Sequence, residues 1–168
     1  MKLVSRVLLL TVVGSLGLPG IAQQQPGHSV PTPMPEFQLL GLDGSTVDSQ
    51  KLPALKKWLL IYVRPNCPSC DKVLKLVQQD QYPGLPSMMT VVVGGVTPDK
   101  VQNMMKGYPN LAGASWYADP QKAASEALKL SGTPVIIGVR GSTLAWHMMG
   151  MIFPDPQKMT SLLISWCK

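Results

Sequence analysis

The feature that most constrains this chain is a continuous apolar run that leads directly into two closely spaced cysteines. Residues 58–63, Trp-Leu-Leu-Ile-Tyr-Val, have the length and composition of a strand that is buried on both faces. After three linking residues comes Cys67-Pro68-Ser69-Cys70. We therefore predict a buried central strand that delivers Cys67 to one edge of a sheet.

A helix is predicted immediately behind the first cysteine. Cys70, Val73, Leu74 and Val77 recur at the spacing i, i+3, i+4, i+7, which is typical of a helix with one face on a sheet. The first sulfur then lies beside the unpaired N–H groups and the positive end of the helix dipole. These groups favour the thiolate, which is the nucleophilic form of cysteine.

The two cysteines therefore receive different roles. We predict Cys67 as the exposed attacking thiol and Cys70 as the resolving thiol, one turn into the helix on its apolar face. Pro68 suits the first helical turn because that turn leaves its N–H groups unpaired. Arg64, three residues before Cys67, adds positive potential. We expect Arg64 and Pro68 to lower the pKa of Cys67.

The rest of the chain alternates strands with helices. Apolar runs predict strands at 89–93, 115–117, 135–139 and 143–149, and helical spacing predicts helices at 98–108, 119–128 and 159–166. Near the start, Phe37 and Leu39, then Asp43-Gly44, then Thr46 and Val47 predict a small edge hairpin. The expected fold class is α/β, with a mixed central sheet flanked by helices and a final antiparallel strand pair.

The expected organisation is one folded domain behind an export signal. Residues 1–22 have a positive start, a short apolar stretch and small residues for cleavage after Ala22, as in a signal peptide. Gly and Pro interrupt the apolar stretch before it reaches spanning length, although an uncleaved anchor remains the alternative. The Gln- and Pro-rich segment 23–35 is predicted to be a flexible tether, and 36–168 the domain.

Charge and cysteine number narrow the function. Loss of Lys2 and Arg6 with the signal lowers the formal net charge from +6 to +4, and no long basic run remains, so nucleic-acid binding is not expected. Three cysteines are too few for a disulfide scaffold, and no second Cys/His pair completes a zinc site. We expect redox exchange without a metal or cofactor.

In these motifs the chain resembles the thioredoxin superfamily, and within it the exported TlpA-like and redoxin branch of thiol-disulfide oxidoreductases. The resemblance runs from Pro35 to about Trp166 and depends on the N-terminal hairpin, on Cys67-Pro68-Ser69-Cys70, and on Gly132-Thr133-Pro134 before a strand. It implies a thioredoxin fold. It also implies that Pro134 is a cis-proline beside the cysteines, and that the backbone of Thr133 pairs with substrate.

The resemblance further implies a role and partners. It favours a reductase of a cysteine-containing exported client, in the periplasm or an equivalent compartment, re-reduced by a membrane-linked thiol electron donor. The Pro-Ser dipeptide alone does not fix the direction, because related pairs span ~150 mV in potential.

Three positions depart from the patterns of related proteins. Ile61 and Asn66 replace the buried acid and the tryptophan of cytosolic thioredoxins, and Arg64 stands where peroxiredoxins need Thr or Ser, so peroxidase chemistry is not expected. Asp71, Lys72 and Lys75 are titratable groups near the motif, in positions typical of a solvated helix face.

Copper binding is the alternative from another class of function. His147-Met148-Met149 and Met151 offer ligands that suit Cu(I). However, Met148 would point away from His147 and Met149 on a strand, and methionine commonly fills gaps in a core. Cys167, next to the carboxyl terminus, is left open as a buried apolar group, a free thiol or a site of intermolecular pairing.

Overall fold

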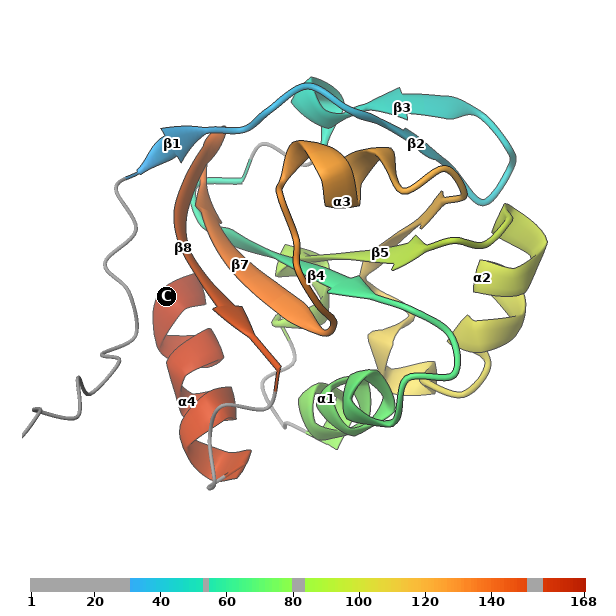
Figure 1. Cartoon of the computed structure of the whole chain (residues 1–168). Coiled ribbons are helices and arrows are strands. Elements are labelled where there is room, and N and C mark those ends of the chain that lie inside the picture. The colour runs from blue at the N-terminus through green and yellow to red at the C-terminus, as the bar shows by residue number, and fades with distance from the viewer. Residues whose placement is uncertain (1–30, 53–54, 80–83, 151–155) are drawn as a thin grey trace, which may run out of the picture.

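The computed structural model describes residues 31–52, 55–79, 84–150 and 156–168. The predicted signal peptide and the tether up to residue 30 lie outside these residues. One eight-stranded sheet has the order β1-β8-β7-β4-β5-β6-β2-β3 (Figure 1). Its strands are β1 (Thr32–Pro33), β2 (Gln38–Leu40), β3 (Thr46–Asp48), β4 (Trp58–Val63), β5 (Met89–Gly94), β6 (Ser115–Asp119), β7 (Val135–Arg140) and β8 (Thr143–Met149).

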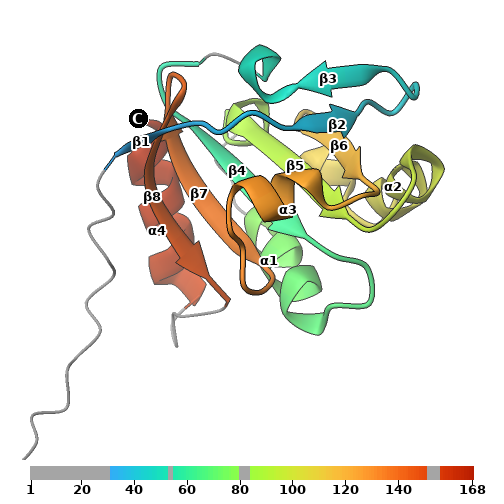
Figure 2. The same ribbon diagram turned by 45° about the horizontal axis from the view of Figure 1, so that its top comes forward.

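Helices cover both faces of this sheet. They are α1 (Pro68–Gln79), α2 (Pro98–Met105), α3 (Ala123–Ala127) and α4 (Pro156–Cys167), and the short 3-10 turns are η1 (Ser49–Lys51), η2 (Pro86–Met88) and η3 (Pro109–Leu111). In both ribbon views α1 and α4 lie on one side of the sheet and α3 lies on the other (Figure 2). The predicted α/β class with a mixed, helix-flanked sheet is confirmed.

The central strand β4 connects two hydrophobic cores. It pairs in parallel with β5 and antiparallel with β7, and all six of its residues are buried. Successive side chains of a strand point to opposite faces. Leu59, Ile61 and Val63 therefore join the core under α1, α2 and α4, whereas Leu60 and Tyr62 join the core under α3 and the N-terminal hairpin. Burial on both faces explains why this run is uniformly apolar.

Helix α1 is the element that the sequence predicts best. Its residues Cys70, Val73, Leu74 and Val77 are all buried against the sheet, as their spacing predicts. Helix α2 starts after Thr97 as expected but ends at Met105, so that Tyr108 lies beyond it. Gly107 and Pro109 flank Tyr108, and neither residue favours continuation of a helix.

The N-terminal part is more strongly tied to the sheet than predicted. The hairpin forms at the sheet edge, but its turn spans five residues and closes with a hydrogen bond from the Gly41 N–H to the Ser45 carbonyl, with positive φ at Gly44. The fold also begins before the predicted boundary at Glu36. Thr32 and Pro33 pair with β8, and Met34 is buried. A composition rich in Pro does not exclude such pairing at an edge.

The largest error in the predicted elements concerns Asp119. Asp-Pro is a common helix start and predicts a helix from residue 119, but Asp119 ends β6 and is 1% exposed. Helix α3 begins only at Ala123, after Lys122 in a left-handed conformation. Tertiary contacts of the carboxylate, described below, outweigh the local helix signal.

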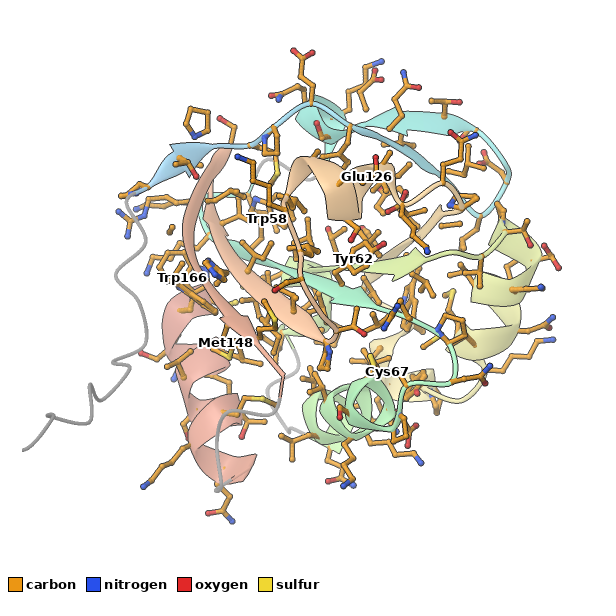
Figure 3. The ribbon with its side chains drawn as sticks, viewed as in Figure 1. Trp58, Tyr62, Cys67, Glu126, Met148 and Trp166 are labelled. Carbon is orange, nitrogen blue, oxygen red and sulfur yellow. A yellow bond between two sulfur atoms is a disulfide. The ribbon has the colours of Figure 1, made fainter. Side chains whose placement is uncertain are left out.

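The C-terminal helix α4 closes the core beside β4. Met159 and Leu163 are buried, and Trp166 donates its indole N–H to the Trp58 carbonyl at 3.2 Å (Figure 3). Cys167 is a buried free thiol, and burial raises its pKa to about 11. Of the three alternatives for Cys167, the structure supports a small buried group with a free thiol. None of the helices in the described ranges is long and apolar enough to span a membrane.

Candidate active site

The cysteine pair lies where β4 ends and α1 begins. Cys67 and Cys70 form a disulfide, with their Cα atoms 5.2 Å apart. Cys70 is fully buried, whereas Cys67 is only partly buried and borders a groove. The backbone N–H of Cys70 donates to the Cys67 sulfur at 3.2 Å. The start of α1 therefore points a backbone N–H group at the more accessible sulfur.

A second loop brings Thr133 and Pro134 against this sulfur. The Thr133–Pro134 bond is cis, as the resemblance implied. The Cys67 Sγ lies 3.7 Å from the Thr133 Oγ1 and 3.9 Å from its carbonyl oxygen. The Arg64 Nε donates to the Thr133 Oγ1 at 3.2 Å. Arg64, Cys67 and Thr133 thus form one cluster, although the cysteine and the threonine are 66 positions apart in sequence.

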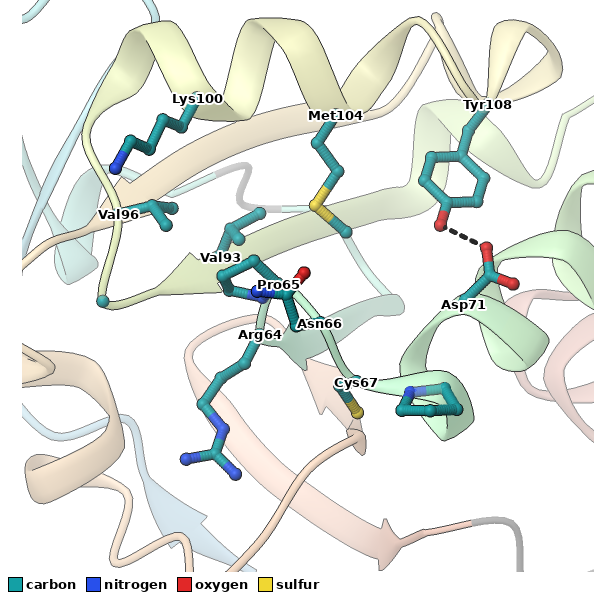
Figure 4. A pocket seen from close by; sticks show the side chains of 12 residues that line it. Arg64, Pro65, Asn66, Cys67, Asp71, Val93, Val96, Lys100, Met104 and Tyr108 are labelled. Carbon is teal, nitrogen blue, oxygen red and sulfur yellow. Dashed lines mark hydrogen bonds between the residues drawn. The ribbon is translucent and has the colours of Figure 1, made fainter.

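The accessible sulfur belongs to a residue that lines a groove, which we call the Cys67 groove. It consists of two hollows, of about 820 Å³ and about 480 Å³, which share residues 64–68 and Gly95. In the larger hollow, Lys100 and Arg64 lie toward one end, Tyr108 and Asp71 lie toward the other, and Met104 and Val93 lie between them (Figure 4). The smaller hollow adds Lys122 and Thr133. The groove is large enough to accept a segment of a polypeptide.

Asp71 is the only carboxylate that lines the described groove, and it is already partnered. The Tyr108 hydroxyl donates to the Asp71 Oδ1 at 2.8 Å, and the Lys75 Nζ lies 2.9 Å from Oδ2. The hydrogen bond from Lys75, and then that from Tyr108, lower the pKa of Asp71. Burial, with a further contribution from Asp71, raises the pKa of Tyr108 to about 12. The pair anchors α1 to the segment after α2.

A buried acid that the sequence did not predict, Asp119, contacts β4 on the face of the sheet opposite to Cys70. The Tyr62 hydroxyl donates to the Asp119 Oδ2 at 3.0 Å, and the N–H groups of residues 123–125 also bond to this carboxylate. Burial raises the pKa of Asp119 more than these bonds lower it. A Cβ at Gly94 would overlap the Tyr62 hydroxyl, so glycine is required for this contact. Ile61, at the position where cytosolic thioredoxins have a buried acid, packs in the other core with Cys70.

The described methionines of the copper alternative lie on opposite faces of the sheet. Met148 packs against the core under α1 and α4, whereas Met149 packs against the core under α3. His147 is exposed, and Met151 lies outside the described residues. Within the described ranges, no three His, Cys, Asp or Glu side chains group closely enough to hold a metal ion. Met149 instead accepts a hydrogen bond from the Ser131 hydroxyl at 3.4 Å.

Comparison with solved structures identifies the fold as the thioredoxin fold. A secreted Mycobacterium tuberculosis disulfide oxidoreductase homologous to Escherichia coli DsbE matches with a TM-score of 0.61 at 14% identity, over 77% of this chain and 95% of that one. A thioredoxin-family thiol:disulfide interchange protein of Chlorobium tepidum matches with a TM-score of 0.58 at 16% identity, over 84% of this chain and 100% of that one.

A protein of a different class is similar to this chain in fold. A peroxiredoxin-like protein of Aquifex aeolicus matches with a TM-score of 0.60 at 12% identity, over 84% of this chain and 90% of that one. No family model matches the sequence, and no curated protein matches it. At these identities the likeness establishes the architecture, and the activity has to be argued from the site.

Proposed function

We propose that this protein is an exported thiol-disulfide oxidoreductase that acts on partner proteins, in the direction of reduction. The observation that carries the proposal is the asymmetric cysteine pair, with one sulfur open to a groove and in contact with the Thr133-Pro134 loop, and the other buried behind it. This is the arrangement that sequential attack and resolution require. The presence of thiol:disulfide interchange proteins among the structural neighbours agrees with it.

The chemistry uses only the sulfurs of the pair and of the client. In the reduced protein, the Cys67 thiolate attacks one sulfur of a client disulfide, the client S–S bond breaks, and the leaving sulfur takes up a proton. Cys70 then loses its proton and attacks the Cys67 sulfur, which releases the second client sulfur as a thiol. Two electrons pass to the client, and the protein is left with its Cys67–Cys70 disulfide, the form seen in the structure.

The surroundings of Cys67 assist this sequence. The Cys70 N–H and the start of α1 stabilise a thiolate at Cys67, and the Arg64 guanidinium, held by Thr133, adds a fixed positive charge. We expect a client segment to lie along Thr133 and Pro134, as the resemblance implies, and Thr133 lines the smaller hollow beside Cys67. Arg64 occupies the place of the peroxidatic Thr or Ser, and this argues against peroxidase activity for this member of the fold.

Partners and location follow from the same proposal. A reductase outside the cytosol must be reduced again after each turnover, so the partners are a cysteine-containing exported client and a membrane-linked dithiol donor. Export would depend on the signal peptide at 1–22, with a soluble domain after cleavage. The intact mass of protein recovered from an outer compartment would distinguish cleavage after Ala22 from an uncleaved anchor.

The reduction potential of the pair tests both activity and direction. The protein without residues 1–22 would be equilibrated in glutathione and dithiothreitol redox buffers and the thiols trapped, with Cys70→Ser as the control that cannot form the disulfide. We expect a potential near the ~-270 mV of thioredoxin, as a reductase requires. A value near ~-120 mV would make the protein an oxidant, and a pair that does not exchange in either buffer would refute the proposed activity.

A further inference from the structure

The side chains that line the Cys67 groove carry more positive than negative charge. Arg64, Lys100 and Lys122 line it, against the single carboxylate of Asp71. Asp71 is neutralised in place by Lys75 at 2.9 Å. Neither Lys100 nor Lys122 forms an ion pair with any described residue, and both are exposed.

Different elements bring these three cations to one edge of the sheet. Arg64 follows β4, Lys100 lies in the first turn of α2 after β5, and Lys122 follows β6. Strands β4, β5 and β6 are parallel neighbours, so their carboxyl ends meet at the same edge. The Gly95 N–H donates to the Asp119 carbonyl at 2.8 Å, which fixes the loop after β5 to the loop that carries Lys122.

The backbone conformation of Lys122 and its contact with Gly95 place its side chain at the groove. Its backbone is left-handed, with φ of 60°, and the Lys122 Cε lies 3.6 Å from the place that a Cβ would take at Gly95. The aliphatic part of Lys122 therefore crosses the exposed Gly95, and the residue lines the smaller hollow together with Cys67 and Thr133. A lysine whose aliphatic stem lies along the backbone can keep its ammonium group in water, here at the edge of the groove.

Between the charged ends, the floor of the groove is apolar. Val93 and Val96 are buried, and Met104 is partly buried beside them (Figure 4). Methionine is unbranched and adapts to side chains of different shapes. An apolar floor with cations at the rim fits a segment that places an apolar residue next to its cysteine and an acidic residue a short distance away.

We propose that the Cys67 groove selects client segments in which acidic residues flank the reacting cysteine, through Lys100 and Lys122 together with Arg64. This inference rests on the proposed disulfide exchange and specifies its substrate class. Charged groups at the rim of a binding site act chiefly on the association rate and on the choice of partner. The selectivity is therefore expected in the rate of exchange and should weaken as salt screens it.

Matched peptides test the inference. Three disulfide-linked peptide dimers would share an apolar residue beside the cysteine and carry Asp, Asn or Lys at the flanking positions. Pre-reduced protein without residues 1–22 is mixed with each, the reaction is quenched with acid, and the released peptide thiols are separated and quantified. Each rate is divided by the rate of the same peptide with dithiothreitol, which removes intrinsic differences in sulfur reactivity.

Charge reversal in the protein provides the second arm. We expect the wild type to react about tenfold faster with the Asp peptide than with the Lys peptide at low salt, and this ratio to fall toward one in concentrated salt. Lys100→Glu with Lys122→Glu should abolish or invert the ratio. Lys100→Glu alone, where an acid in the first helical turn is well tolerated, should reduce it by about threefold. Lys158→Glu with Lys129→Glu, outside the groove, changes the net charge equally and should leave the ratio intact.

The outcomes separate this inference from the activity on which it rests. Equal rates for the three peptides, or a preference that survives the Lys100 and Lys122 reversal, would overturn the acidic-client inference while disulfide exchange stands. Failure of every peptide to react, although dithiothreitol reduces the same peptides, would overturn the proposed function itself.

Discussion

Removal of one hydroxyl at Tyr62 should reveal how firmly the buried Asp119 is held. Tyr62→Phe keeps the aromatic ring in its core but deletes the donor that reaches the Asp119 Oδ2 at 3.0 Å. Asp119 is 1% exposed, so water cannot readily replace that donor. A hydrogen bond to a charged group contributes about 1.5–3 kcal/mol, and we expect the free energy of unfolding to fall by about this amount at pH values above the pKa of Asp119.

The pH dependence gives this prediction its sign. The bond from Tyr62 lowers the pKa of Asp119, so its full contribution is present above that pKa and declines as the pH falls through it. Burial holds the pKa of Asp119 above its ordinary value, so the decline begins at a higher pH than for an exposed aspartate. Below it, a neutral hydrogen bond worth about 0.5–1.5 kcal/mol remains.

Urea unfolding followed by circular dichroism, at several pH values, measures the difference between wild type and variant. Tyr117→Phe is the matched control, because the Tyr117 hydroxyl bonds to no residue within the described part of the chain. A Tyr62→Phe variant that unfolds at the same urea concentration as the wild type, or that loses equal stability at every pH, would refute the reasoning.

Two further predictions concern the core. Cys167 is buried and its pKa is raised to about 11, so roughly one thiol in a thousand is ionised near pH 8. The oxidised native protein should therefore give no colour with Ellman's reagent, and the unfolded protein should give about one thiol per chain. Rapid labelling of the native protein would contradict this prediction. Leu74→Ala should cost about 2–5 kcal/mol in urea unfolding because Leu74 is 0% exposed, whereas Leu162→Ala, at 39% exposed, should cost less than about 1 kcal/mol. Equal losses for the two leucines would contradict the described packing of α1.

The local sequence pattern was sufficient to predict a helix or strand wherever the signal lay within that one element. The uniformly apolar β4 and the spacing of Cys70, Val73, Leu74 and Val77 each predict one element, and both predictions hold. The place of Thr133-Pro134 beside Cys67 was accessible only by resemblance, since nothing local brings together residues 66 positions apart. Pairing of β7 with β4 produces that contact.

The remaining features depend on sheet order, which the sequence did not supply. Lys100 and Lys122 reach the Cys67 groove because β5 and β6 lie in sequence beside β4, so that their following loops gather at one edge. The prediction at Asp119 was wrong because Asp-Pro is a local helix signal, whereas the buried Asp119 carboxylate is stabilised by a hydroxyl from another strand. Edge pairing of Thr32–Pro33 was likewise invisible in a Pro-rich segment.

The most direct test of the central claim is to trap the covalent intermediate with a disulfide-bonded peptide and measure intact mass. If Cys67 attacks and the fully buried Cys70 resolves, pre-reduced Cys70→Ser should accumulate a mixed disulfide at Cys67, and pre-reduced Cys67→Ser should form none. The assignment of an attacking Cys67 and a resolving Cys70 would be contradicted if Cys67→Ser formed the adduct as readily as Cys70→Ser, or if neither variant formed it.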